Sequence, residues 1–171
     1  MKKLTHLTLL VLLAAWLPAC VFPGYKIKPG DKLGGMQFIN DDEACPGPNF
    51  SDICGFPALV DGTCLIPAST SVFWISTGWV EATQAELEST WKDSTWKLTF
   101  DGHELDLAKF GTYDMELDGQ KARIWEVCIS NPPEGKHTVY YEYEFIHGVH
   151  LGKRFSDLTF TVVPASVAPL P

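Results

Sequence analysis

The stretch of sequence that decides the fold is residues 132–163, PPEGKHTVYYEYEFIHGVHLGKRFSDLTFTVV. Over residues 137–146, apolar or aromatic side chains alternate with polar ones, as in an extended strand whose successive side chains point to opposite faces of a sheet. Residues 155–163 repeat the alternation, and Gly148 and Gly152 mark a turn between the two segments. The stretch therefore predicts an antiparallel hairpin with one buried and one solvated face.

The same stretch resembles the last two strands of bacterial immunoglobulin-like and fibronectin-type-III-like domains. The residues that carry the resemblance are Pro133, Gly135, His137, Thr138 and Val139 in the first strand, and Thr159, Phe160, Thr161 and Val162 in the second. The resemblance implies an all-β fold, an immunoglobulin-like antiparallel β-sandwich, and a structural hydrogen bond for His137. It implies no activity, because that fold carries many unrelated functions.

Shorter alternating stretches, separated by turn residues, predict the remaining strands. The Asp-Gly pairs at 101–102 and 118–119 favour type I′ turns, since both central positions of such a turn need a positive φ. We expect the strands themselves at residues 72–80, 95–100, 104–107, 113–117 and 123–129.

One short helix is expected between these strands. Thr83 and Glu86 have the spacing of a capping box, in which each side chain accepts a hydrogen bond from the backbone amide of the other residue. The helix should run from Gln84 to about Trp91.

The N-terminus reads as an export signal. Residues 1–19 have a basic start and an apolar run of signal-peptide length. The run ends in Leu-Pro-Ala-Cys, residues 17–20, which resembles the bacterial lipobox. The resemblance implies cleavage before Cys20, lipidation of that cysteine, and a lipoprotein anchored in the bacterial cell envelope that faces away from the cytoplasm. Pro18 stands where Ala or Ser is usual, and the alternative is a plain secreted protein.

The charge of the chain limits its partners. The formal net charge is −8, and loss of Lys2 and Lys3 with the signal peptide makes it −10. Negative charge opposes binding to nucleic acid and to anionic lipid head groups. Membrane attachment should therefore come from acyl chains, whose burial supplies the affinity.

Four cysteines remain besides Cys20, and outside the cytoplasm an even number reads as two disulfides. In the strand over residues 123–129, Cys128 faces away from the tryptophan side, so its partner should lie across the outside of the sheet. We expect Cys64 with Cys128 and Cys45 with Cys54; Cys54 with Cys128 and Cys45 with Cys64 is the alternative. The spacing does not suit zinc, and no metal or cofactor is expected.

The composition supports one folded domain with flanking segments. With 46% hydrophobic residues, the chain can bury one core, which we place at residues 69–164. Residues 20–36 are rich in Gly and Pro and should form the lipid-anchored tether. Residues 37–68 should form a disulfide-stapled cap lying on the sandwich, and residues 165–171 a Pro-rich tail.

The sequence offers little for catalysis. It contains no Gly-x-Ser-x-Gly, no His-Glu-x-x-His and no glycine-rich phosphate loop. Glu142 and Glu144 share a strand face about 7 Å apart, and paired acids serve glycosidases. Alternating Glu on a strand more often marks a solvated face, so a glycan hydrolase is the least favoured function and we predict no enzyme activity.

His147 and His150 lie three residues apart in the turn of the predicted hairpin. With a carboxylate such as Asp157 they would form a metal site, but histidines in a glycine-rich turn are more often polar loop residues. We retain both as candidate ligand-binding residues rather than as metal ligands.

Aromatic side chains are the remaining candidates for binding. Trp74 and Trp79 lie on opposite faces of their strand, so at least one points outward unless the cap covers it, and Tyr140 shares the polar face of its strand. Exposed rings would bind a glycan or a protein partner. We therefore predict a non-enzymatic surface lipoprotein serving as an interaction or structural module, with a carbohydrate-binding module that uses these aromatics as the alternative.

Overall fold

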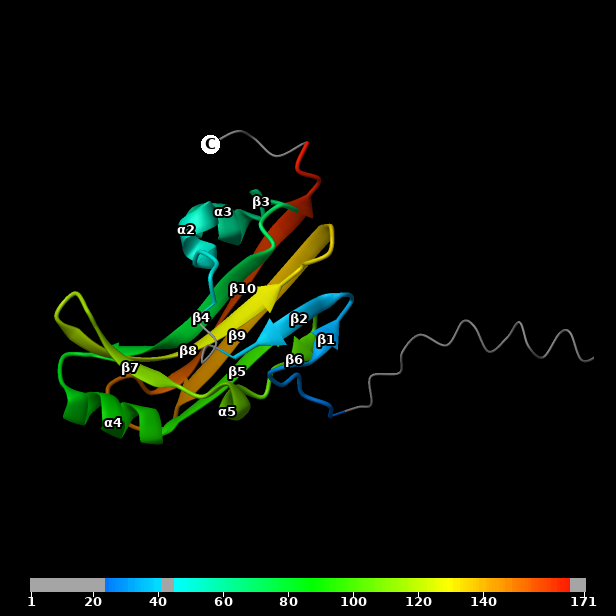
Figure 1. The fold of residues 1–171 in the computed structure, drawn as a ribbon. Helices are drawn as coiled ribbons and strands as arrows, with labels where there is room; N and C mark the ends of the chain where they lie inside the picture. The colour runs from blue at the N-terminus through cyan, green and yellow to red at the C-terminus, as the bar shows by residue number, and fades with distance from the viewer. Residues whose placement is uncertain (1–23, 41–44, 167–171) are drawn as a thin grey trace, which may run out of the picture.

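Two five-stranded sheets carry the alternating stretches of the sequence. The computed structural model describes residues 24–40 and 45–166 (Figure 1). One sheet contains β1 (Lys32–Leu33), β2 (Met36–Ile39), β8 (Gln120–Ser130), β4 (Val72–Glu81) and β7 (Tyr113–Leu117). The other contains, in this order, β3 (Cys64–Pro67), β10 (Gly152–Val163), β9 (Gly135–Phe145), β5 (Ser94–Phe100) and β6 (His103–Glu104).

The core lies between the inner faces of the two sheets. The ring of Phe160 in β10 lies 5.6 Å from that of Phe73 in β4 and 6.1 Å from that of Phe100 in β5. Phe38 of β2 meets Phe100 edge to face at 5.7 Å. Removing these rings from water is the main force that holds the layers together.

The central hairpin is confirmed. β9 and β10 pair antiparallel without interruption from Gly152 opposite Phe145 to Val162 opposite Gly135. His137 and Val139 are buried, whereas Glu144 on the other face is exposed.

The two Asp-Gly turns are confirmed as well. Asp101 and Gly102 have φ of 48° and 78°, and Asp118 and Gly119 have φ of 51° and 80°. These positive values at both central positions are the geometry that a type I′ turn requires. The first turn joins β5 to β6, and the second joins β7 to β8.

The fold is an all-β sandwich, as predicted, and its strand order follows that of the immunoglobulin fold. β4, β8 and β7 take the B, E and D positions of one sheet, and β5, β9 and β10 take the C, F and G positions of the other. Two features depart from that order. β2 pairs with β8 instead of β4, and β3 joins β10 in a parallel pairing.

Four helices form in the described chain, the predicted one and three others. The expected one is α4 (Gln84–Lys92), and its capping box is present. The others are α2 (Phe50–Cys54), α3 (Phe56–Asp61) and α5 (Leu107–Phe110). α2 begins where the side chain of Asn49 accepts a hydrogen bond from the amide of Ser51, a local cap in a segment that reads as irregular from its prolines. α5 replaces the end of the strand expected at residues 104–107.

Both disulfide pairings drawn from the sequence were wrong. The bonds are Cys45–Cys128 and Cys54–Cys64. Cys64 opens β3 and points into the core beside β10, so it lies in the other sheet from Cys128. The facing of Cys128 was read correctly, because it looks outward from β8. The segment that leads to Asn49 crosses the outer face of β4 and β8 at this point and brings Cys45 to Cys128.

The sandwich begins earlier than residue 69. Ile27 is buried, and its amide donates to the carbonyl of Glu104, so part of the expected tether is structured. Met36 and Phe38 in β2 are also buried. The signal peptide, Cys20 and residues 167–171 of the expected tail lie outside the described residues. Within the described ranges, no helix has the length and apolar character needed to span a bilayer.

Candidate functional site

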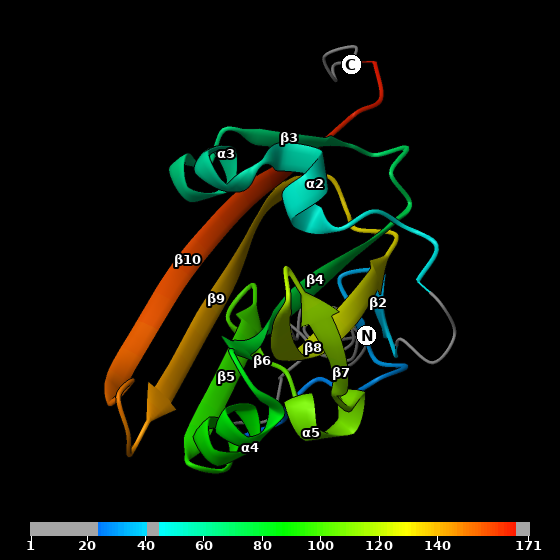
Figure 2. The ribbon, with the colours of Figure 1, turned by 90° about the vertical axis from the view of Figure 1, so that its left-hand side faces the viewer.

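One side of the sandwich is open between β4 and β10. β9 pairs with the whole of β10, but in the described chain β3 covers its other edge only from Phe160 to Val163. The outer edge of β4 makes one bridge, from Trp74 to Asn49, in the same part of the chain. In Figure 2, α2 and α3 lie at the end of β10 where β3 joins it. The rest of both edges carries backbone groups without a strand partner.

A cavity of about 340 Å³ lies in this opening, which we call the β4–β10 cleft. Its apolar lining comes from Phe50, Leu59, Ile75 and Leu158. Its polar lining comes from Asn49, Ser51, Ser76, Thr77, Tyr141, Tyr143 and Ser156. None of these residues is charged, so the cleft suits an uncharged group.

The alternation of the two long strands explains why the cleft is hollow. Tyr141 and Tyr143 continue the inward row of β9 that begins with His137 and Val139. Ser156 stands opposite Tyr141 in the register of β10. A small serine at an inward position between the larger residues of the row leaves space that the neighbouring side chains do not fill.

Hydroxyl groups of the cleft are available to a ligand. Within the described chain, the side chains of Tyr141, Tyr143 and Ser156 make no hydrogen bond. Burial raises the pKa of Tyr141 well above its usual range, so its phenol stays protonated and can donate. Each hydroxyl can both donate and accept, which fits a ligand with amide or hydroxyl groups.

The turn between β9 and β10 contacts the end of β4. His150 Nε2 lies 3.0 Å from Oε1 of Glu81 in β4, and the His150 ring lies 5.0 Å from that of Trp79. Trp79 in turn packs on Phe145 at 4.6 Å and donates from Nε1 to Glu81. The turn is therefore fastened to β4.

The structure brings only two of the candidate aromatic and histidine residues together. Trp79 and His150 meet where the turn contacts β4, as described above. Trp74 is half-buried on the outer face of β4, opposite Cys128 in the register. Tyr140 lies on the outer face of the other sheet, where it stacks with Phe155 at 6.4 Å. His147 is exposed in the turn.

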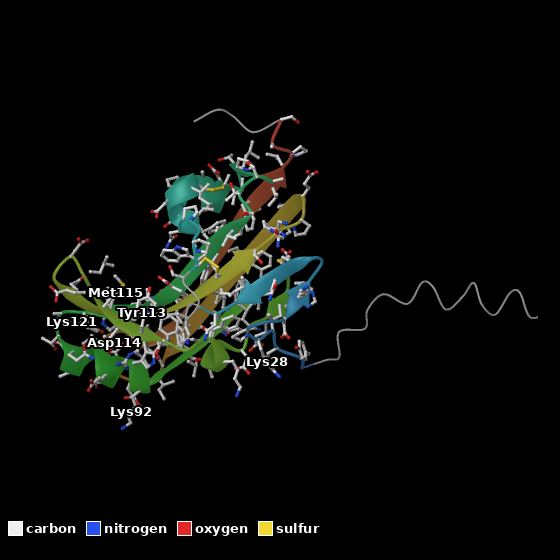
Figure 3. The ribbon with its side chains drawn as sticks, viewed as in Figure 1. Lys28, Lys92, Tyr113, Asp114, Met115 and Lys121 are labelled. Atoms are coloured by element: carbon white, nitrogen blue, oxygen red, sulfur yellow. A yellow bond between two sulfur atoms is a disulfide. The ribbon has the colours of Figure 1, made fainter. Side chains whose placement is uncertain are left out.

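Reasoning from the sequence missed the hydroxyls of the cleft and the exposed apolar residues of the turn. In the turn, Val149 is 95% exposed and Ile146 and Leu151 are exposed as well; in β10, Phe155 is 70% exposed. The available signal was the presence of Ile146, Val149 and Leu151 in a short turn that also contains Gly148 and Gly152. A second, smaller group is formed by Met115 (Figure 3) and Leu117 in β7.

A second cavity, of about 300 Å³, lies beside a cluster of tryptophans. Trp91, Trp96 and Trp125 line it together with Glu104 and Asp106. Trp96 stacks on Trp91 at 5.2 Å and on Tyr143 at 5.0 Å. Because these two stacks occupy the Trp96 ring, that residue offers little surface on which a sugar could stack.

The carboxylates weighed for catalysis lie away from the cleft. Glu142 accepts hydrogen bonds from Lys153, at 2.8 Å, and from Tyr140, and both lower its pKa. Glu144 is exposed on the same outer face. In the described ranges, no three His, Cys, Asp or Glu residues gather as metal ligands.

The chain matches no model of a known protein family, no curated protein and no solved structure. Since sandwiches of this kind host many functions, the side chains of the site have to indicate what the protein does.

Proposed function

We propose that the protein is a non-enzymatic binding module of the bacterial cell envelope and that it binds its partner in the β4–β10 cleft. The observation that supports this is the set of hydroxyls on Tyr141, Tyr143 and Ser156, placed over an apolar floor. A few polar groups around a mostly apolar cavity of this size are typical of ligand sites. Because no described lining residue is charged, the part of the partner that enters should be uncharged.

The environment of Glu142 supports a role without catalysis. A glycosidase needs one carboxyl group that holds its proton near neutral pH. Lys153 and Tyr140 lower the pKa of Glu142, which is the opposite of that requirement. Glu142 and Glu144 also lie on the outer face, away from the cleft.

The envelope assignment rests on the sequence and on the two disulfides. The lipobox-like residues 17–20 predict an anchor at Cys20, and disulfides persist in oxidising compartments outside the cytoplasm. Resemblance to bacterial immunoglobulin-like domains remains part of this proposal, and the strand order is compatible with it.

The cleft can be tested by filling it. Ser156→Trp would place an indole in the cavity, whereas Thr95→Trp puts the same ring at an exposed position on the outer face of β5. We expect ligands found on parallel glycan and peptide arrays to bind the unmodified protein and Thr95→Trp, and to lose binding to Ser156→Trp. Ligands that bind all three proteins equally would place the binding site elsewhere.

Carbohydrate binding on the outer face is a second candidate. The ring planes of Tyr140 and Phe155 are 26° apart, and the exposed Phe155 adjoins the pair formed by Glu142 and Lys153. An exposed aromatic pair beside charged groups on a sheet is suited to stacking on a sugar ring. Here Phe155→Ala should abolish glycan binding, and Ser156→Trp should leave it intact.

A further inference from the structure

We propose that the partner is an extended peptide segment of another protein, which adds as a strand to the free edge of β10 next to β3. This inference rests on the proposed function, because it uses the same β4–β10 cleft. It specifies the ligand as a polypeptide backbone with uncharged side chains.

β3 shows how a strand sits on this edge. It pairs parallel with β10 from Cys64 opposite Phe160 to Pro67 opposite Val163. Cys64 and Ile66 are buried between the sheets, whereas Leu65 between them is 42% exposed. A strand on the edge of β10 therefore sends every second side chain into the core.

Beyond β3 no strand pairs with the same edge in the described chain, although α3 also contacts β10. A Cβ added to Gly62 would lie 3.6 Å from the side chain of Thr159, so the chain entering β3 passes beside Thr159 and the section of β10 without a strand partner runs from Leu158 back to Lys153. At a rise of about 3.3 Å per residue, that section is roughly 20 Å long and has room for five or six residues. The cavity borders this section through Leu158 and Ser156, where the inward side chains of an added strand would lie.

The section from Lys153 to Leu158 carries charged side chains on Lys153, Arg154 and Asp157, one of the features that discourage pairing, but it lacks two others. Its register with β9 is unbroken, so it contains no bulge, and residues 153–158 contain no proline. Native sheets commonly protect a regular edge with such features. Both cationic side chains have partners beside the edge: Lys153 pairs with Glu142, and the Arg154 guanidinium donates to the carbonyl of His150.

A peptide fits these groups better than a glycan. A free strand edge presents amide donors and carbonyl acceptors at a repeat of two residues, which another backbone matches. The inward side chains should be small or medium-sized and uncharged, because the cavity is lined by hydroxyl, amide and apolar groups and by no described charged residue.

The test uses a phage-displayed library of random nine-residue peptides, selected on the purified protein. We expect enriched peptides with uncharged residues at alternate positions. N-methylation of the bound peptide, one amide at a time, should weaken binding about tenfold at every second amide and little at the others. A ligand held only by its side chains would lack that period of two.

Variants connect this binding to the cleft. Ser156→Trp should abolish peptide binding, and Tyr141→Phe, which removes only a hydroxyl, should weaken it. Thr95→Trp and Tyr140→Phe are the matched controls on the outer faces and should bind as the unmodified protein does. An unchanged melting temperature identifies the variants that remain folded. If Ser156→Trp does not fold, Tyr141→Phe takes its place as the variant that tests binding in the cleft.

Three results would overturn the peptide inference. The first is peptide binding without the alternating N-methyl effect. The second is glycan binding that Ser156→Trp abolishes, with no peptide bound, in which case the cleft remains the binding site. The third is a dimer that Ser156→Trp dissociates, with no peptide bound, which would assign the edge to a second copy of the chain. If no ligand responds to Ser156→Trp, the proposed function fails as well.

Discussion

His137 Nδ1 lies 2.7 Å from Oδ2 of Asp101, so the start of β9 is tied to the turn after β5. The other ring nitrogen of His137 lies 2.8 Å from the carbonyl oxygen of Pro133. With acceptors at both nitrogens, the ring is suited to carry two protons. The hydrogen bond to Asp101 is the main cause that raises the pKa of His137, and the structural role predicted for this histidine is confirmed.

This pair should make stability depend on pH. The folded state holds the proton of His137 more tightly than the unfolded chain does. The contribution of the His137–Asp101 pair to the free energy of unfolding is therefore complete below pH 6.5 and is lost as the pH rises through the raised pKa of His137. Asp101→Asn keeps a residue that tolerates the positive φ of the turn. The difference in melting temperature between the two proteins should be largest in acid and shrink in alkali. A difference that stays constant with pH would contradict this assignment, and His147→Gln, in the exposed turn, is the control.

Phe160 and Phe155 lie on the same strand and test the burial of the core. Phe160 is fully buried among Phe50, Phe73 and Phe100, whereas Phe155 is exposed. Phe160→Ala should lower the free energy of unfolding by about 3–5 kcal/mol. Phe155→Ala should change it by less than about 0.5 kcal/mol. Urea denaturation of both variants measures the two values, and similar losses would show that the facing of β10 is misassigned.

The two disulfides should contribute unequally to stability. Cys45 and Cys128 are 83 residues apart, and Cys54 and Cys64 are 10 apart. By the loss of chain entropy in the unfolded state, the first bond stabilises by about 4.5 kcal/mol and the second by about 3 kcal/mol. Paired substitution by Ala should therefore lower the urea midpoint more for Cys45 and Cys128. Peptide mapping without reduction tests the connectivity, and a Cys45–Cys54 peptide would refute it.

The capping box of α4 predicts a smaller, local effect. The Thr83 hydroxyl accepts from the amide of Glu86, and the Glu86 carboxylate accepts from the amide of Thr83. Thr83→Ala should reduce the free energy of unfolding by about 1 kcal/mol. Ser89→Ala, at an exposed position inside the same helix, is the control and should not destabilise. Equal effects of the two substitutions would mean that the cap does not stabilise the helix.

Processing at Cys20 is the prediction drawn from the sequence alone. Mass spectrometry of the mature protein should find Cys20 at the N-terminus with acyl chains attached. Cys20→Ser should leave the protein in the soluble fraction or with its leader attached. An unmodified Cys20 in the mature chain would end the lipoprotein proposal and favour plain secretion.

The predictable features are those that neighbouring residues determine. The alternation in β9, the Asp-Gly turns and the Thr83 cap each depend on a few consecutive side chains, and all were recognised. The outward facing of Cys128 was recognised for the same reason. Asn49 as a helix cap was missed only because the prolines and cysteines around it suggested irregular structure.

The features that could not be predicted depend on which segments meet. Cys64 pairs with Cys54 because β3 joins β10, a parallel contact between residues about a hundred positions apart. The β4–β10 cleft likewise exists because two distant strand edges face each other. The alternation of side chains in β9 predicts which face of the strand carries Tyr141. The space beside Ser156, in contrast, depends on where α2 and β4 end in the folded structure.

The backbone hydrogen bond between Ile27 and Glu104 determines which side of the molecule would face the membrane if the chain is tethered at its N-terminus. It places the first described residues beside β6, and the order of the sheet puts β6 at one margin and β10 near the other. Only three residues separate Cys20 from Gly24 in the sequence. An anchor at Cys20 would therefore hold the β6 side close to the lipid and point the edge of β10 proposed to bind a peptide outward, within reach of soluble proteins and of proteins on an opposing surface.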